Sequence, residues 1–176
     1  LPGAPPLVLD VGCHRGSFLL PLAAQEPQHN ILGIERQKER VIRTRRKIER
    51  LGLGNVWASR SGGHEALRAF ANDSVAVIHV LFPDPWPKRR HSSRRLVDTK
   101  FLGECHRILK RDGLLRFVTD DPPYAWAVEK FSRDIPTLKP ETNPLPAYPP
   151  SGFELTFTEL EKPIHRLAWR KAGSAG

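Results

Sequence analysis

Short apolar runs alternate with segments of helical spacing through the first two thirds of the chain, and this alternation restricts the possible folds more than any other feature. Runs typical of buried strands occur at residues 6–11, 30–35, 55–59, 74–82 and 114–120. Helical spacing is found between them, at residues 17–25, 37–51, 64–70 and 95–109. A strand followed by a helix and a further strand pairs in parallel with a right-handed crossover. The chain is therefore predicted to be an α/β protein with a doubly wound, mostly parallel sheet.

The pattern changes after residue 131. Residues 136–150 are rich in proline, and two alternating runs follow, FELTFTEL at residues 153–160 and IHRLAWRK at residues 164–171. Alternation of apolar and polar residues is typical of half-buried strands. We predict that these two runs form an antiparallel pair that closes one edge of the sheet, which brings the sheet to seven strands.

Length and cysteine content indicate one intracellular domain. A chain of 176 residues has room for a single core, so residues 1–176 are expected to form one domain. No apolar run approaches 18 residues, and the segment LPGAPPLVLD lacks the layout of a signal peptide. We therefore expect a cytoplasmic protein with no membrane segment. Cys13 and Cys105 are too far apart for a local zinc pair and too few for a disulfide framework, so both are expected to be buried thiols without a metal.

The charge balance favours a polyanionic partner. Lys and Arg number 28 against 19 Asp and Glu, which leaves a net charge of +9 on a small domain. Charge alone does not distinguish RNA from DNA or from an anionic membrane. The arginine-rich helix at residues 37–51 is either a second RNA surface or a solvated face; its cations include Arg43, Arg45, Arg46 and Lys47.

The first predicted strand ends in a glycine turn that suits a nucleoside ligand. Ligands of such sheets bind at the carboxyl ends of the strands. Gly12 and Gly16 would let the backbone approach a ligand closely, and their G-x-x-x-G spacing differs from the G-x-G-x-x-G of dinucleotide sites. Glu35 ends the second strand, where a carboxylate can accept both ribose hydroxyl protons. Asp10 is placed to face an ammonium group beneath the turn. Each acid taken singly is more often a strand-end cap than a ligand group, but the two acids together with the glycine turn favour a ligand site.

The fourth predicted strand runs into the segment LFPDPWPKRRHSSRRL. Its prolines fix backbone angles and remove amide donors, so Asp84 and Trp86 are presented by a stiff loop. Six potentially cationic groups follow within eight residues, a density suited to phosphate contacts: Lys88, Arg89, Arg90, His91, Arg94 and Arg95. The alternative interpretation is a solvated basic helix start.

Three motifs resemble those of a known family. Residues 82–96 have the form F-P-D-P-W-P-K-x-R-H followed by R-R-L, residues 119–124 read T-D-x-x-x-Y, and residues 151–154 read S-G-F-E. This combination resembles the bacterial tRNA (guanine-N7)-methyltransferases, class I enzymes that use S-adenosylmethionine. The resemblance implies a Rossmann-like methyltransferase domain that methylates N7 of a guanine in tRNA, with the variable loop of the tRNA as the expected position.

The resemblance also implies site residues. Asp10, Gly12, Gly16 and Glu35 would hold the cofactor, and Asp84 would lie at the junction of cofactor and guanine as the catalytic residue. No metal is expected. The residues assigned to the tRNA substrate are Lys88, Arg90, His91, Arg94, Arg95, Asp120, Tyr124, Ser151 and Glu154.

Two positions depart from the family pattern. His14 stands where the middle glycine of G-x-G-x-G is expected, and it would be strained by roughly 1–2 kcal/mol if the backbone there has positive φ. Gly62 stands where an acid near the adenine is expected, and Glu65 follows further along. These departures keep open an RNA-binding pseudoenzyme with a weakened cofactor site, and a class I methyltransferase acting on another RNA remains a further alternative. A nicotinamide-dependent oxidoreductase would explain Glu35 but neither the glycine spacing nor the loop.

The reaction itself asks for positioning more than for proton transfer. Guanine N7 has an in-plane lone pair and no proton, so no general base is needed to create the nucleophile. Asp84 is therefore expected to accept hydrogen bonds from the N1–H and N2–H₂ edge of guanine, or to orient the methyl donor. Trp86 either stacks on a base or packs the loop.

Overall fold

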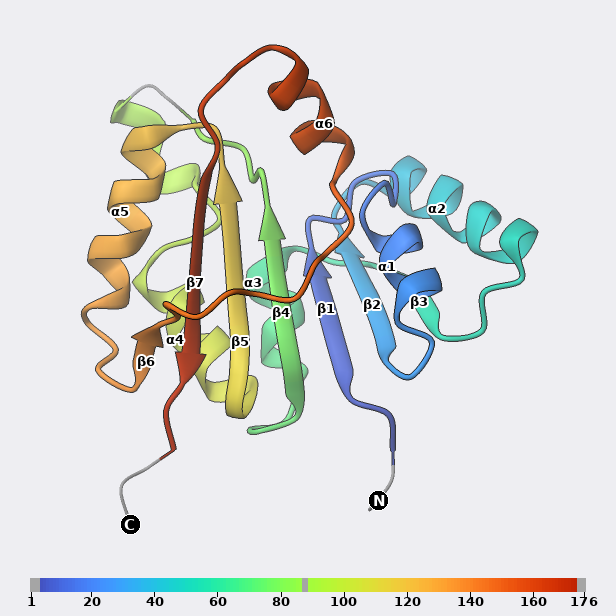
Figure 1. Cartoon of the computed structure of the whole chain (residues 1–176), viewed down its shortest axis with the longest axis horizontal. Helices are drawn as coiled ribbons and strands as arrows, with labels where there is room; N and C mark the ends of the chain where they lie inside the picture. Colours follow the sequence, from blue (N-terminus) through green and yellow to red (C-terminus); the bar gives the residue numbers. More distant parts are fainter. Residues whose placement is uncertain (1–3, 87–88, 174–176) are drawn as a thin grey trace.

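A computed structural model describes residues 4–86 and 89–173 of the chain. One seven-stranded sheet has the order β3-β2-β1-β4-β5-β7-β6. The first five strands pair in parallel, β7 is antiparallel to β5, and β6 is antiparallel to β7 (Figure 1). The strands are β1 (Leu7–Val11), β2 (Asn30–Glu35), β3 (Val56–Arg60), β4 (Val75–Leu81), β5 (Leu109–Thr119), β6 (Leu138–Pro140) and β7 (His165–Lys171).

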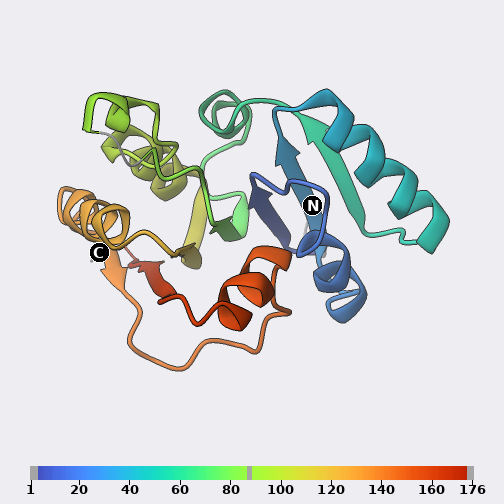
Figure 2. The same ribbon diagram turned by 90° about the horizontal axis from the view of Figure 1, so that it is seen from above.

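Helices cover both faces of this sheet. Figure 2 shows α4 and α5 on one side and α1 and α6 on the other. The helices are α1 (Leu19–Gln25), α2 (Lys38–Leu51), α3 (Gly63–Arg68), α4 (Thr99–Ile108), α5 (Pro122–Ser132) and α6 (Gly152–Glu159), with a 3-10 helix η1 at Arg89–Arg94. One core cluster joins the sheet to α3, α4 and α5, and a second joins it to α1 and to the last part of α2. The predicted doubly wound, mostly parallel α/β fold is therefore confirmed.

The antiparallel edge exists, but its strands are not the predicted pair. Residues 153–160, predicted as a strand, lie in and directly after α6, and the edge pair is β6 with β7. One reason is local, since Ser151 caps the helix by accepting a hydrogen bond from the Glu154 amide at 3.1 Å; the other is the ion pair that Glu154 forms with Arg166 on β7. A serine followed three residues later by glutamate is the sequence pattern of a capping box. The segment before β7 thus forms a helix above the strand ends (Figure 1).

The predicted buried thiols are confirmed. Cys13 and Cys105 are both free and buried, and burial raises the pKa of each thiol. Within residues 4–86 and 89–173, no group of three or more His, Cys, Asp or Glu side chains is placed to hold a metal ion. None of the helices in the described part of the chain combines the length and the apolar character that crossing a bilayer requires.

Candidate active site

A cleft of about 410 Å³ lies at the carboxyl ends of β1, β2, β3 and β4. The parallel strands all end at this edge of the sheet, and α6 lies over the same edge (Figure 1). Segments far apart in sequence supply the walls, including Gly12, His14, Glu35, Arg36, Gly62, His64, Asp84, Trp86, Arg94, Arg95 and Phe153. The structure therefore brings the glycine turn, the end of β2 and the proline loop into one site.

The turn after β1 has the left-handed backbone that its glycines allow. Gly12 has φ of 88° and Gly16 has φ of 77°. A Cβ on Gly12 would meet no atom within 4 Å, so the open space beside this residue belongs to the cleft. A Cβ on Gly16 would come within 3.0 Å of the Thr44 side chain, so Gly16 lets the turn pack against α2. Only Gly12 of the pair lines the cleft.

His14 has the strained backbone that the sequence suggested. Its φ is 51°, a left-handed conformation that costs a non-glycine residue roughly 1–2 kcal/mol. Its amide donates to Glu35 Oε2 at 3.1 Å, and its ring lies 5.4 Å from that of Phe153. Partial burial lowers the pKa of His14, so the ring is neutral at pH 7. His14 therefore presents a neutral ring to the cleft, and its amide still bonds to Glu35.

Glu35 is fixed in the cleft by the backbone around it. Its side chain is buried, Oε2 accepts from the His14 amide, and Oε1 accepts from the Gln37 amide at 2.9 Å. Arg40 Nη1 lies 3.6 Å from Oε2. A carboxylate oxygen has two lone pairs, so both oxygens can still accept from ligand hydroxyls. This geometry suits a pair of ribose hydroxyls.

Asp10 lies beneath the turn with an unsatisfied oxygen. The residue is 2% exposed, and its Oδ2 has no hydrogen-bond partner in the described structure. Burial, with the negative charge of Glu35 as a lesser cause, raises the pKa of Asp10 to about 7. An unpaired buried carboxylate is costly, and a ligand cation would remove that cost. The residue therefore fits the ammonium group of an amino-acid moiety.

The loop after β4 is held in an unusual backbone conformation. Phe82 has φ of 49° and Trp86 has φ of 44°, values that are rare for aromatic residues and that cluster at functional sites. The Phe82 amide donates to the Val118 carbonyl oxygen at 2.7 Å and ties the start of the loop to β5. Asp84, between two prolines, is exposed and lies 3.5 Å from Arg36 Nη2. The loop thus presents Asp84 toward the end of β2.

The cations after this loop do not form one uniform group. Lys88 lies outside the described residues, and so does the side chain of His91, whose backbone is part of η1. Arg90 and Arg94 are exposed, and the guanidinium of Arg94 lies 5.1 Å from the Trp86 ring centroid. The Arg95 side chain is only 14% exposed and donates to the Pro85 carbonyl oxygen at 2.7 Å. The structure therefore separates two adjacent arginines that the sequence treated alike.

The residues assigned after β5 are divided between surface and core. Asp120 is partly exposed, with Oδ2 at 3.7 Å from Lys162 Nζ. Tyr124 is fully buried, and its hydroxyl accepts from the Val97 amide at 2.9 Å. Burial raises the pKa of Tyr124 to about 12. Asp120 follows the carboxyl end of β5 but does not line the cleft, whereas Tyr124 supports the segment that follows η1.

Ser151 and Glu154 are used within the protein. Ser151 is the N-cap of α6, and Glu154 accepts from Arg166 Nε at 3.0 Å and from Nη2 at 2.6 Å. The Gly152 amide donates to Ser17 Oγ at 3.1 Å. These contacts fix α6 against β7 and against the segment before α1. Both assigned residues therefore set the position of α6.

Phe153 is a further cleft residue that the sequence motifs did not indicate. This side chain is 42% exposed and lines the cleft from α6, with its ring 6.2 Å from that of Phe82. Phe157, one turn further on, lies 5.3 Å from Phe82. The helical spacing of residues 153, 157 and 160 was a usable signal, but the alternating pattern concealed it. Phe82 and Phe153 give the cleft an aromatic wall, and Phe157 packs against both of them.

The acidic side chain expected at position 62 is absent, because Gly62 stands there. It is the N-cap of α3, and a Cβ there would meet nothing within 4 Å. Glu65 is directed to the Ser61 hydroxyl at 3.2 Å. Asp98 lines the cleft, with Oδ1 at 4.0 Å from His64 Nε2. Asp98 also caps α4, because its Oδ1 accepts from the Phe101 amide at 2.7 Å.

α2 carries seven Lys and Arg residues, and two of the four named in the sequence analysis form hydrogen bonds within the fold. Arg45 Nε donates to the Ala58 carbonyl oxygen at 2.8 Å, and Lys47 Nζ donates to the Arg15 carbonyl oxygen at 3.0 Å. Arg43 and Arg46 are exposed. The helix is thus attached to β3 and to the glycine turn by its own basic side chains.

The strand order, the antiparallel β7 and the cleft at the carboxyl ends define the class I S-adenosylmethionine-dependent methyltransferase fold. A SAM-dependent methyltransferase from Aquifex aeolicus matches with a TM-score of 0.65 at 19% identity, covering 94% of this chain and 82% of that chain. The aminoglycoside resistance methyltransferase NpmB1 matches with a TM-score of 0.65 at 17% identity, covering 97% and 89%. At these identities the likeness establishes the fold alone.

Sequence relatives narrow this class to one family. Residues 4–167 match a family whose description is "Putative methyltransferase". The tRNA (guanine-N(7)-)-methyltransferase of Oceanobacillus iheyensis is 31% identical, over 92% of this chain and 78% of the relative. That of Syntrophotalea carbinolica is 34% identical, over 94% of this chain and 74% of the relative. The chain belongs to the tRNA (guanine-N7)-methyltransferase family.

Proposed function

We propose that residues 1–176 act as one methyltransferase domain that transfers a methyl group from S-adenosylmethionine to N7 of a guanine in tRNA. The observation that carries this proposal is the single cleft that joins two sets of residues. Glu35 and the glycine turn, with Asp10 beneath it, suit an amino-acid nucleoside, and the proline loop places Asp84 on the opposite wall. Exposed cations follow that loop directly, where a polyanionic substrate would lie.

The residues of the first two strands fit the cofactor. Asp10 would pair with the ammonium group, since its unsatisfied Oδ2 needs a cation. Glu35 would accept the ribose hydroxyl protons, and the open space at Gly12 admits the ligand close to the backbone. When bound, S-adenosylmethionine supplies an electrophilic methyl group on its sulfonium.

Guanine would be placed by the opposite wall. Its N7 lone pair needs no general base, so Asp84 acts by orientation: its carboxylate accepts from the N1–H and N2–H₂ edge of the base. Phe153 offers an exposed ring in the same cleft for stacking, as single-stranded RNA bases require. Holding the base in the reactive geometry is the main contribution of the protein to the rate.

The tRNA backbone would follow the cations beyond the loop. Lys88, Arg90, His91 and Arg94 would contact phosphates or sugars near the target nucleotide, and Asp120 would contact the nucleotide itself. We further propose that the guanine lies in the variable loop of the tRNA. Because tRNA is the substrate, we place the protein in the cytoplasm.

Transfer of tritium from methyl-labelled S-adenosylmethionine to bulk tRNA tests this function directly. We expect label in 7-methylguanosine after nuclease digestion, and none when the variable-loop guanine is replaced by adenine. Label in ribosomal RNA but not in tRNA would favour a methyltransferase of another RNA. Binding of tRNA without label transfer, and without heat on titration with S-adenosylhomocysteine, would instead identify an RNA-binding pseudoenzyme.

A further inference from the structure

The guanidinium of Arg95 contacts three groups within the protein. Its Nε donates to the Pro85 carbonyl oxygen at 2.7 Å, and its Nη2 lies 3.6 Å from Asp121 Oδ1. Its Cζ lies 4.6 Å from the centroid of the Tyr124 ring, within the range of a cation–π contact. Planar stacking together with directed donors is the use for which arginine and lysine are not interchangeable.

The acceptor of the Nε bond lies next to Asp84. The loop is fixed at its start by the Phe82 amide, which donates to Val118. Arg95 fixes it three residues later through Pro85, so Asp84 stands between two anchors. Pro83 and Pro85 have no amide N–H to donate. The hydrogen bond from the Arg95 side chain therefore contributes more to fixing this loop.

The other contacts of Arg95 lead to the segment after β5. Asp121 caps α5 by accepting from the Tyr124 amide at 2.7 Å, and the Tyr124 hydroxyl accepts from the Val97 amide at 2.9 Å. Asp120, which we propose contacts the nucleotide, immediately precedes this cap. Arg95 therefore connects the loop that presents Asp84 to the segment that presents Asp120.

We propose that Arg95 is a positioning residue that holds Asp84 in place, and not a phosphate contact. The proposal rests on the proposed function, in which Asp84 orients the guanine. Arg94 gives the natural comparison, because it is adjacent, exposed and packed on Trp86. Replacement of the two arginines should therefore change different properties: the methylation rate for Arg95 and the salt dependence of tRNA binding for Arg94.

Single-turnover methylation and filter binding across a salt series separate these roles. For Arg95→Ala we expect the rate at saturating tRNA to fall about 10- to 100-fold, as misplacement of a reacting group does, with the salt dependence of tRNA binding unchanged. For Arg94→Ala we expect the log–log salt slope to become shallower by about one unit, because one phosphate contact is lost.

Arg95→Lys tests whether Arg95 acts through its contacts within the protein or through its positive charge alone. Lysine keeps the positive charge and would serve a phosphate equally well, but it cannot stack on Tyr124 while donating to Pro85. We expect its rate to stay within a few-fold of Arg95→Ala. Asp121→Asn keeps the cap acceptor and removes the charge, and should give a smaller fall. Arg133→Ala, which removes an exposed charge near the end of α5, controls for net charge.

Hydrogen exchange gives a readout that does not depend on activity. In Arg95→Ala we expect faster exchange of the amides of Asp84 and Trp86 and unchanged exchange in β1. If the native chain methylates no tRNA guanine, the proposed function fails, and the exchange data alone decide whether Arg95 holds the loop. Restoration of the rate by Arg95→Lys, a shallower salt slope in Arg95→Ala, or unchanged loop exchange would overturn the proposal.

Discussion

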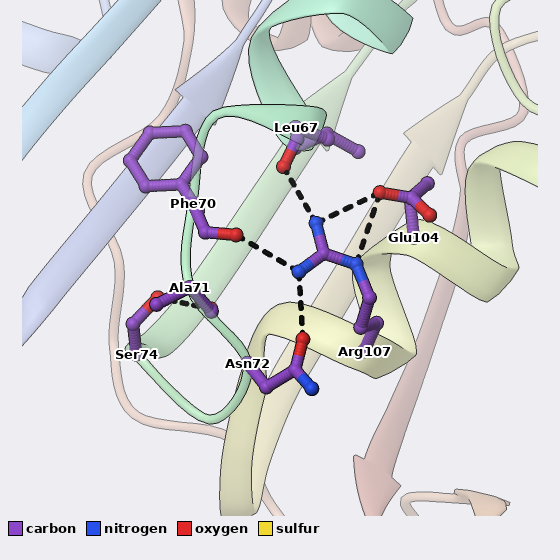
Figure 3. Close-up of polar contacts among 7 residues, drawn as sticks. All are labelled: Leu67, Phe70, Ala71, Asn72, Ser74, Glu104 and Arg107. Carbon is purple, nitrogen blue, oxygen red and sulfur yellow. Dashed lines mark hydrogen bonds and ion pairs between the residues drawn. The ribbon is translucent and has the colours of Figure 1, made fainter.

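Each of the two loops at the ends of β4 is held by an arginine, but the loops differ in the groups that they leave exposed. The loop that enters β4, residues 69–74, is held by Arg107 from α4 (Figure 3). Its Nη1 donates to the Phe70 carbonyl oxygen and to Asn72 Oδ1, both at 2.8 Å. Its Nη2 donates to the Leu67 carbonyl oxygen at 3.0 Å, and Nη2 and Nε both donate to Glu104 Oε2. Every guanidinium nitrogen of Arg107 thus has a partner within the protein.

The loop that leaves β4, residues 82–86, is fixed at few points and keeps polar groups available. Arg95 holds it at Pro85, while Asp84 is exposed in the cleft. Phe82 and Trp86 have positive φ here. In the entering loop the residue with positive φ is Asp73, a type that tolerates this conformation well.

The difference shows how a structural loop and a functional loop can be told apart. In the structural loop the polar groups satisfy one another, and the backbone strain falls on a tolerant residue. In the loop with the proposed function the strain falls on aromatic residues, and one carboxylate, that of Asp84, is exposed. Substitutions at the two ends of β4 should therefore change different properties.

The largest effect is expected from Asp84→Ala in the leaving loop. A methyl acceptor that loses its orienting carboxylate should react about 100-fold more slowly or worse, with bulk tRNA affinity nearly intact. Single-turnover methylation and filter binding on the same variant measure both quantities. Loss of tRNA binding with an unchanged rate at saturation would contradict the role given to this residue.

Arg107→Ala should instead lower stability. It leaves two backbone carbonyl oxygens, Asn72 Oδ1 and the Glu104 carboxylate without their donor. We expect the free energy of unfolding to fall by about 2 kcal/mol, with a discount for the partial exposure of the Arg107–Glu104 pair. The methylation rate of the folded protein should be unchanged. Urea unfolding measures the loss, and Arg107→Lys should recover only part of it because an ammonium cannot reach all the acceptors. A slower methylation rate with unchanged stability would contradict the purely structural role given to Arg107.

The pH dependence of stability should report on two buried titratable groups, Asp10 on β1 and His79 on β4. The pKa of Asp10 is raised to about 7, mainly by burial, and the pKa of His79 on β4 is lowered to about 3, by burial and by Arg116. Between pH 4 and 6.5 folded Asp10 keeps a proton that the unfolded chain releases, so its contribution to stability falls as pH rises. Folded His79 lacks a proton that the unfolded chain binds, so its contribution rises. Each slope is about 1.4 kcal/mol per pH unit, and the two oppose each other.

Removing one of the two groups should therefore reveal the pH dependence of stability that the other contributes. In urea unfolding at pH 4.5, 5.5 and 6.5, we expect the stability of Asp10→Asn to rise with pH more steeply than that of the native chain. We expect the stability of His79→Phe to fall over the same range. Parallel pH profiles for the native chain and both variants would show that neither group has the shifted pKa given above.

The smallest effect is expected from His14→Gly. Glycine relieves the positive φ and keeps the amide that donates to Glu35, so S-adenosylhomocysteine should bind equally well or a few-fold more tightly. Calorimetry measures this affinity. A large loss would show that the His14 ring, which faces Phe153, contacts the ligand.

The sequence was sufficient where the signal is local. Four of the five parallel strands lie within a residue of the predicted apolar runs, whereas β5 begins at Leu109, five residues before the run at 114–120, because its polar start pairs with β4. The glycine turn, Glu35 at the end of β2 and the stiff loop around Asp84 also follow from adjacent residues. Parallel strands end at one edge, so the order of the elements along the chain is enough to place these features together.

Only the tertiary structure decided what depends on distant partners. Residues 153–160 fit both a strand and a helix, and the Ser151 cap with the Arg166–Glu154 pair selects the helix that brings Phe153 into the cleft. Arg94 and Arg95 look equivalent in sequence. Arg95 nevertheless lies inward because it pairs with Asp121, 26 positions further along the chain. A side chain's role depends on the groups it meets in space, and sequence periodicity does not encode which of two adjacent cations meets them.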